Sequence, residues 1–184
     1  MKLKNLFMLA LTVLSCCAFA QQNATQVKGE LKFKRSNVKL FKVVNGKTTE
    51  IANTAPTKNG KFGFLFYPEY EGVYVIGTGN ENSPNENHLF YFKGGDQLDV
   101  ALSDTSYALN GKLNSKENIV MKQWRDLTNP LFQKAINFMK VQSTFMDYFP
   151  EQEAIVAKSK TFLTGKATGN AKFDQQIKDI MQLD

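Results

Sequence analysis

The first half of the chain alternates apolar and polar residues in the manner of half-buried β-strands. Between residues 27 and 34 every second side chain is apolar or Gly. The same alternation recurs at Phe62, Phe64 and Phe66, and at Leu98, Val100 and Leu102. Because successive side chains of a strand point to opposite faces, this period of two predicts antiparallel strands, each with one buried face, between residues 27 and 111.

Three turn sequences punctuate this region, at Asn45-Gly46, Asn59-Gly60 and Gly94-Gly95. Asn-Gly and Gly-Gly pairs supply the positive φ angles that tight hairpin turns require, so each predicts a hairpin. Residues 89–92 are apolar on both faces, which predicts a central strand. With about eight short strands, the region predicts an antiparallel β-sandwich or a partly closed barrel.

After residue 111 the apolar residues follow a helical period. Val120, Trp124, Leu127 and Leu131 form one stripe, and Pro130 predicts a kink or a junction between two helices. A cap at Asn114, with Glu117 three residues later, opens this run.

Further helices are expected beyond it. Pro150 opens one over residues 151–163, and Asn170 caps the last, whose stripe is Phe173, Ile177 and Ile180. The fold class is therefore α+β by segregation, with a β-domain at residues 27–111 followed by three or four amphipathic helices over residues 112–184.

Residues 1–20 have the three parts of a secretory signal peptide: a basic start, an apolar stretch of about ten residues, and the exit Ala18-Phe19-Ala20. We expect cleavage after Ala20, a short segment at residues 21–26, and a periplasmic or cell-envelope location. The alternative is a lipoprotein with a lipid anchor at Cys16 or Cys17. No later stretch has membrane-spanning length, so we expect no membrane span.

Loss of residues 1–20 also limits the chemical groups available to the mature protein. Both cysteines of the chain lie in this leader, so the mature protein would carry no thiol for a disulfide, a nucleophile or a zinc-thiolate site. Removing Lys2 and Lys4 from the 23 basic residues leaves 21 against 17 acidic ones, a mild net charge of +4. For an exported protein of this charge we expect no nucleic-acid partner.

Catalytic constellations are missing from the sequence. A Ser-His-acid triad would have to use His88, the single histidine. Asp96, Asp99 and Asp104 cluster near one turn, but Asp99 falls on the solvent face of a strand, which disfavours a calcium site. Gly94-Gly95 lacks the Lys-Ser/Thr end of a phosphate loop. We expect no catalytic residue, no cofactor, no metal and no enzyme activity in this chain.

Aromatic residues remain as candidates for binding. The chain holds 15 Phe and 6 Tyr, and strand alternation assigns most of those in the strands to a core. The residues selected for a ligand or partner surface are Tyr74, Tyr91, His88 and Trp124. His88 directly follows the polar loop at residues 79–87.

Several short motifs resemble one family. They are Gly29-Glu30-Leu31, Asn59-Gly60-Lys61-Phe62, Gly72-Val73-Tyr74, Phe92-Lys93-Gly94-Gly95-Asp96, Leu109-Asn110-Gly111 and residues 168–174. In this order they resemble the N-terminal β-domain and helical linker of exported thioredoxin-like thiol-disulfide oxidoreductases of Gram-negative bacteria, of the alkyl hydroperoxide reductase/thiol-specific antioxidant type. The resemblance covers residues 27–184.

In that family, the resemblance implies, a thioredoxin fold with a Cys-x-x-Cys site comes next. This sequence contains no Cys-x-x-Cys, so no catalytic residue is carried over. The chain is either the front part of a longer protein or a stand-alone relative without the catalytic half.

The expected function is that of a non-catalytic N-terminal module of a cell-envelope thioredoxin-like protein, which positions the oxidoreductase or binds its client. Its partner would be a thioredoxin-like domain in cis or in trans, or an envelope protein client. The alternative is a free-standing periplasmic binding or adhesion module for glycan or peptide.

Overall fold

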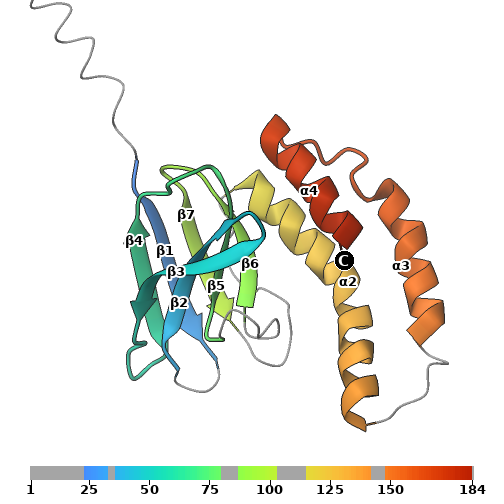
Figure 1. Cartoon of the computed structure of the whole chain (residues 1–184), viewed down its shortest axis with the longest axis horizontal. Coiled ribbons are helices and arrows are strands. Elements are labelled where there is room, and N and C mark those ends of the chain that lie inside the picture. Colours follow the sequence, from blue (N-terminus) through green and yellow to red (C-terminus); the bar gives the residue numbers. More distant parts are fainter. Residues whose placement is uncertain (1–22, 33–35, 80–86, 103–114, 142–147, 184) are drawn as a thin grey trace, which may run out of the picture.

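A computed structural model gives the arrangement of the chain (Figure 1). It describes residues 23–32, 36–79, 87–102, 115–141 and 148–183. The expected signal peptide with Cys16 and Cys17 lies outside these ranges, and so do Asn114 and Asp104.

Seven strands in the described residues form two facing sheets: β1 (Thr25–Leu31), β2 (Val38–Val44), β3 (Lys47–Thr54), β4 (Lys61–Phe66), β5 (Gly72–Gly77), β6 (Asn87–Phe92) and β7 (Gln97–Leu102). The strand orders are β4-β1-β7 and β3-β2-β5-β6. Strands β1 and β7 run parallel, and the other pairs are antiparallel. The α+β class and the sandwich are confirmed; the sheets do not close into a barrel.

The inner faces of the two sheets share one apolar core, and the predicted alternation is confirmed in it. It holds the side chains of Val27, Phe62, Phe64, Tyr74, Ile76, Phe90, Phe92, Leu98, Val100 and Leu102, among others. Gly29 faces Phe62 across the β1–β4 pair, and a Cβ at Gly29 would lie 2.2 Å from the Phe62 ring. A glycine at this position therefore lets the Phe62 ring lie across the neighbouring strand.

Only one of the three predicted hairpin turns joins paired strands. Asn45 (φ 52°) and Gly46 (φ 73°) connect β2 to its partner β3, as predicted. Gly60 (φ 77°) and Gly95 (φ 88°) also have positive φ, but they lead from one sheet to the other. The hairpin prediction is wrong at these two turns, because reversing the chain does not decide which strand becomes the hydrogen-bonded neighbour.

Three helices follow in the described part of the chain: α2 (Lys116–Val141), α3 (Tyr148–Phe162) and α4 (Ala171–Leu183). The Ser115 hydroxyl oxygen accepts a bond from the Asn118 N–H at 3.2 Å, so Ser115 caps α2, while the predicted cap, Asn114, lies outside the described residues. Pro130 lies inside α2, which continues as one bent helix (Figure 1). Asn170 caps α4 as predicted, its Oδ1 accepting from the Phe173 N–H at 3.2 Å.

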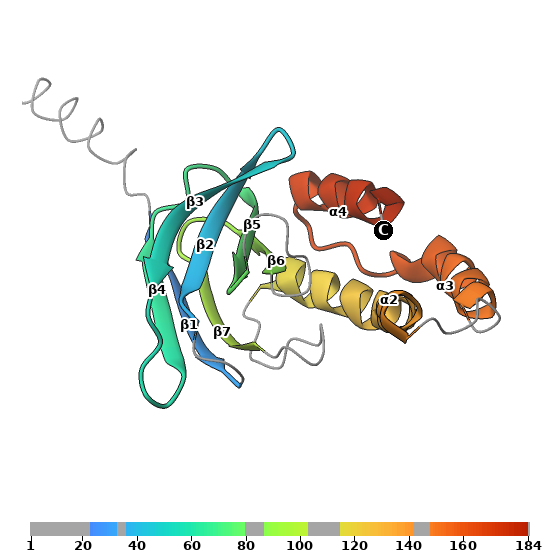
Figure 2. The same ribbon diagram turned by 60° about the horizontal axis from the view of Figure 1, so that its bottom comes forward.

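The helices form a third layer on the outer side of the sheet that contains β5 and β6 (Figure 2). A second apolar cluster unites this face with α2 and α4 through Val73, Tyr91, Trp124, Phe173 and Ile177. Strand β6, expected to be central, is the last strand of its sheet. It is apolar on both faces because helices cover the side that solvent would otherwise reach.

Among the described residues, no helix combines the length and the apolar character needed to cross a membrane.

Candidate functional site

Polar side chains from four separate segments meet where the helices join the sandwich. They are Glu71, directly before β5; Tyr91 of β6; Glu117 and Asn118 of the first turn of α2; and Asn170, the cap of α4. We call these five residues the junction. Tyr91, Glu117 and Asn118 are buried, whereas Glu71 and Asn170 are half-buried.

Asn118 completes the hydrogen bonding of the edge strand. Its Oδ1 accepts from the Tyr91 N–H at 2.8 Å, and its Nδ2 donates to the Tyr91 carbonyl at 2.8 Å. At the other end of β6, Arg125 Nη2 donates to the Leu89 carbonyl at 3.3 Å. Helix α2 therefore covers an edge that would otherwise present unpaired backbone groups.

Asn170 ties the start of α4 to the other segments. Its Nδ2 lies 2.7 Å from Glu71 Oε1, 3.1 Å from Glu117 Oε1 and 3.3 Å from the Tyr91 hydroxyl oxygen. The amide has two hydrogens, so these three acceptors share them. Since its Oδ1 caps the helix, one side chain both starts α4 and fixes its position.

Charge at the junction is balanced by Lys93, whose Nζ lies 2.9 Å from Glu117 Oε1. Burial raises the pKa of Glu117, but bonds from its own backbone N–H, Lys93 and Asn170 outweigh burial and lower the pKa overall. The bond to Glu117 is the main reason that the pKa of Lys93 is raised. Burial raises the pKa of Tyr91 above its usual range. At neutral pH the junction thus holds an ion pair beside an un-ionised phenol.

The four residues selected from the sequence as a partner surface are all buried. Tyr74 and Tyr91 are 0% exposed, His88 2% and Trp124 4%. Tyr74 belongs to the sandwich core and stacks on Tyr70, with ring centroids 4.7 Å apart. The structure brings Tyr91 and Trp124 together in the cluster under the helices. Each has a packing role inside the protein, and a binding role for them stays a prediction.

His88 lies under α2 with its Nδ1 3.4 Å from Arg125 Nη1. Burial, with a smaller contribution from the Arg125 charge, lowers its pKa to about 3. An imidazole that stays neutral down to such acidity is badly matched to proton transfer near neutral pH, where a general base needs a pKa close to 7.

The two described aspartates near the Gly94-Gly95 turn have different environments. Asp96 is buried and accepts from the Lys93 N–H at 2.9 Å, so it braces the turn, whereas Asp99 is exposed as expected. In the described ranges, no three His, Cys, Asp or Glu side chains gather in a way that could hold a metal ion.

Sequence reasoning missed most of the junction. Asn170 was expected as a cap, but its contacts with Glu71, Tyr91 and Glu117 were not foreseen. Asn118 gave one signal, because Asn has a low helix propensity and its short side chain commonly hydrogen-bonds backbone groups near a helix start.

No family model matches the chain, and no curated protein matches it. The resemblance to the N-terminal part of thioredoxin-like oxidoreductases therefore stays a prediction from the motifs.

Proposed function

We propose that this chain is a non-catalytic module of the cell envelope that holds a thioredoxin-like oxidoreductase domain, in cis or in trans, in a fixed position, or binds the client of that domain. The observation that carries the proposal is the junction. A module that positions a partner must hold its own segments in a fixed relative orientation. Hydrogen bonds of Asn170 and Asn118 tie four segments together into one rigid unit.

Packing supports the same function. The outer face of β5 and β6 shares one apolar cluster with α2 and α4, so the helices cannot swivel without exposing Trp124, Phe173 and Ile177. Losing the burial of side chains of this size costs roughly 1.5–3 kcal/mol each. A partner attached to the helices would therefore be held at a set angle to the sandwich.

The alternative, a free-standing binding or adhesion module, would bind through either the aromatic strands or the polar loop at residues 79–87. Tyr74, Phe90, Tyr91 and Phe92 are each at most 1% exposed, which removes the aromatic platform from the surface, whereas residues 80–86 of the loop lie outside the described residues. For location, the leader motivates export to the periplasm with cleavage after Ala20, with lipid attachment at Cys16 or Cys17 as the alternative.

The test is the size of the native polypeptide in the cell envelope, read by blotting with antibody against residues 27–110. A product larger than the 20.8 kDa chain by about one domain, roughly 100–200 residues, supports a partner in cis. A product of the chain's own size supports a partner in trans only if a thioredoxin-fold protein cross-links to it. Own size without such a partner overturns the proposal in favour of the alternative.

Activity gives a second test. The purified chain, residues 21–184, should not reduce insulin disulfides in a turbidity assay, and clear turnover would contradict a non-catalytic role. In the protein together with its oxidoreductase, Asn170→Ala should slow insulin reduction while leaving reaction with a small disulfide reagent unchanged. Asn53→Ala, on an exposed strand, is the matched control and should change neither rate.

A further inference from the structure

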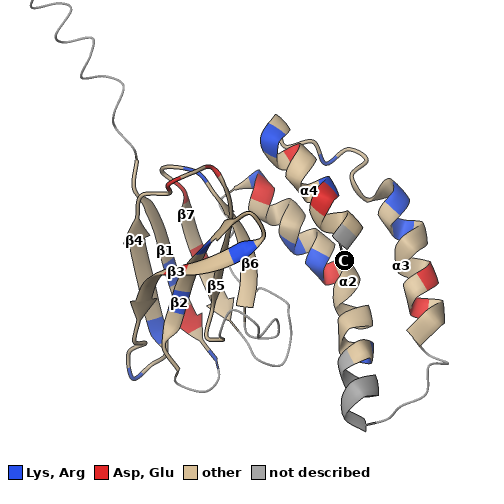
Figure 3. Cartoon of the chain, viewed as in Figure 1, with Lys and Arg blue, Asp and Glu red and all other residues tan. Residues whose placement is uncertain are grey.

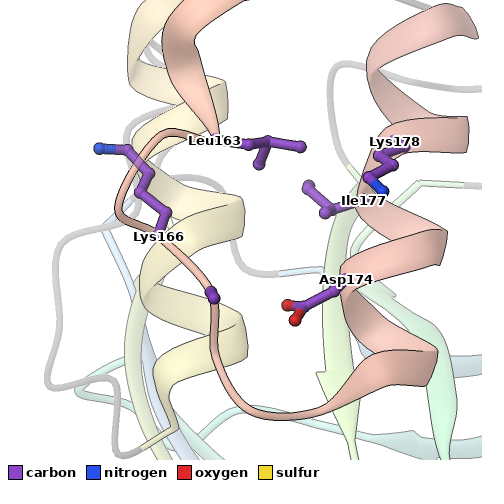
Figure 4. A pocket seen from close by; sticks show the side chains of 6 residues that line it. Leu163, Lys166, Asp174, Ile177 and Lys178 are labelled. Atoms are coloured by element: carbon purple, nitrogen blue, oxygen red, sulfur yellow. The ribbon is translucent and has the colours of Figure 1, made fainter.

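A cavity of about 190 Å³ opens between the end of α3, the loop after it and α4. Leu163 and Ile177 face each other across it, with Asp174 below them (Figure 4). Ala167 and the side chains of Lys166 and Lys178 complete the lining. The wall is therefore mostly aliphatic, with charged groups at its margins.

Asp174 is already engaged by the loop. Its Oδ1 accepts from both the N–H (3.2 Å) and the hydroxyl (2.9 Å) of Thr168. Lys166 holds its ammonium 5.1 Å from the centroid of the Phe162 ring, directed away from Leu163 and Ile177 (Figure 4). The cavity thus has a braced carboxylate on one side and the aliphatic stems of two lysines on its rim.

The segments that form this cavity carry lysines that take part in none of the ion pairs of the described residues. Basic residues line the later part of α3, the loop and α4 (Figure 3). Residues 158–179 hold five lysines and two acidic residues, Asp174 and Asp179. The described residues contain five Lys-carboxylate ion pairs, and none includes these lysines: Lys158, Lys160, Lys166, Lys172 and Lys178.

We propose that this cavity and its basic rim bind an acidic protein segment through one large aliphatic side chain, which inserts between Leu163 and Ile177. Sites for whole small molecules are typically about 300–1,000 Å³, so a cavity of this size suits a single side chain better than a cofactor or an acyl chain. Carboxylates on either side of the anchor would meet the lysines of the rim.

The test uses a fluorescein-labelled peptide in which one Leu is flanked on both sides by glutamates, titrated with residues 21–184 and followed by anisotropy. Replacing the peptide Leu by Ala should weaken binding at least about tenfold, because the anchor supplies most of the affinity. Replacing its glutamates by lysines should abolish binding. These comparisons need no change in the protein.

Protein variants locate the site. Ala167→Leu fills the cavity and should weaken peptide binding at least about tenfold. The melting temperature of this variant should equal that of the wild-type protein. Lys178→Gln should weaken binding severalfold and reduce its salt dependence. The matched control is Lys28→Gln, which removes one exposed charge on β1 and should leave affinity unchanged.

Three results would overturn the inference. The first is no binding of the Leu peptide, and the second is equal binding of the Leu and Ala peptides, which marks attraction by charge alone. The third is Lys178-dependent binding to phosphatidylglycerol vesicles without binding to the peptide, which marks a membrane surface instead.

This inference rests on the proposed function, because both take the helical part as the partner-binding part. The two fail separately. Polypeptide size and cross-linking to a thioredoxin-fold protein test the module, whereas the peptide titration tests only the cavity.

Discussion

Asn118 occupies the first turn of α2, where the backbone N–H groups have no intrahelical partner and an Asn side chain commonly bonds the backbone of its own helix. Here its amide points at the sheet and bonds both backbone groups of Tyr91, while its Nδ2 also reaches Ser115 Oγ at 2.9 Å. One side chain supplies what a neighbouring strand would supply at that position. The Asn118 side chain therefore satisfies backbone groups at the edge of β6 rather than backbone groups of α2.

Asn118→Ala should lower the free energy of unfolding by about 2–3 kcal/mol, because it leaves a buried N–H and a buried carbonyl without partners. Urea denaturation of residues 21–184 measures the loss. Asn118→Asp keeps the acceptor and loses the donor, so it should also destabilise the protein. Asn53→Ala, at an exposed position, should stay within about 0.5 kcal/mol of wild type. Equal stability of the Asn118→Ala and Asn53→Ala variants would contradict the edge-covering role.

His88 makes stability depend on pH in one direction. The pKa of the His88 imidazole is about 3 in the folded protein, below its ordinary 6.5. Between these two pH values the unfolded chain therefore binds a proton at His88, whereas the folded chain does not. The folded state should therefore lose stability as pH falls from about 6.5 toward 3, by up to about 5 kcal/mol over the whole window.

Urea midpoints between pH 7 and pH 5 test this. His88→Gln should flatten the dependence in that range and leave it unchanged above pH 7. An NMR titration that places the imidazole pKa near 6.5 in the folded protein would refute the argument.

Among the secondary-structure elements, the helices differ in how much they bury. In α4, Phe173 and Ile177 are each 1% exposed and pack under the sheet. In α3 only Ile155 is buried, while Phe149 and Val156 are about half exposed. Helix α4 is therefore part of the apolar cluster under the sheet, whereas α3 reaches that cluster through the half-buried Phe162.

Asn170→Ala should raise amide exchange in α4 more than in β1 or β5. The change removes a helix cap, worth about 1 kcal/mol, together with the bonds to Glu71 and Glu117. Hydrogen exchange read by mass spectrometry measures it.

Asn170→Asp separates the two roles. Asp is an equally good cap, but it loses the donor and adds a carboxylate beside Glu71 and Glu117, so exchange in α4 should still rise. Wild-type exchange in this variant would mean that only the cap matters.

In the molecule as a whole, two cores share one sheet. Strands β5 and β6 send Tyr74, Ile76, Phe90 and Phe92 into the sandwich and Val73 and Tyr91 toward the helices. Undocking the helices would expose one face of this sheet. The three layers should therefore unfold together.

Trp124, the single Trp of the chain, tests that coupling. It is 4% exposed and packs against Phe162 with ring centroids 5.2 Å apart, so its fluorescence reports the helical layer. Its urea transition should coincide with the transition seen by far-ultraviolet circular dichroism. A fluorescence change at clearly lower urea would show that the helices leave the sandwich first.

Local patterns in the chain were enough to predict which faces are buried and where the chain turns. The stripes Phe62-Phe64-Phe66 and Leu98-Val100-Leu102 point inward, Asn45 and Gly46 form a hairpin, and Asn170 caps a helix. These features follow from periodicity and backbone preference, which neighbouring residues are enough to encode.

Strand pairing and the meeting of distant side chains came from the folded arrangement. The turns at Gly60 and Gly95 lead between sheets, β1 lies parallel to β7, and β6 is an edge strand hidden by α2. The junction joins Glu71 to Asn170 across 99 positions of sequence. A local pattern says that a face must be covered but does not identify the segment that covers it, because that choice depends on the packing of the whole chain.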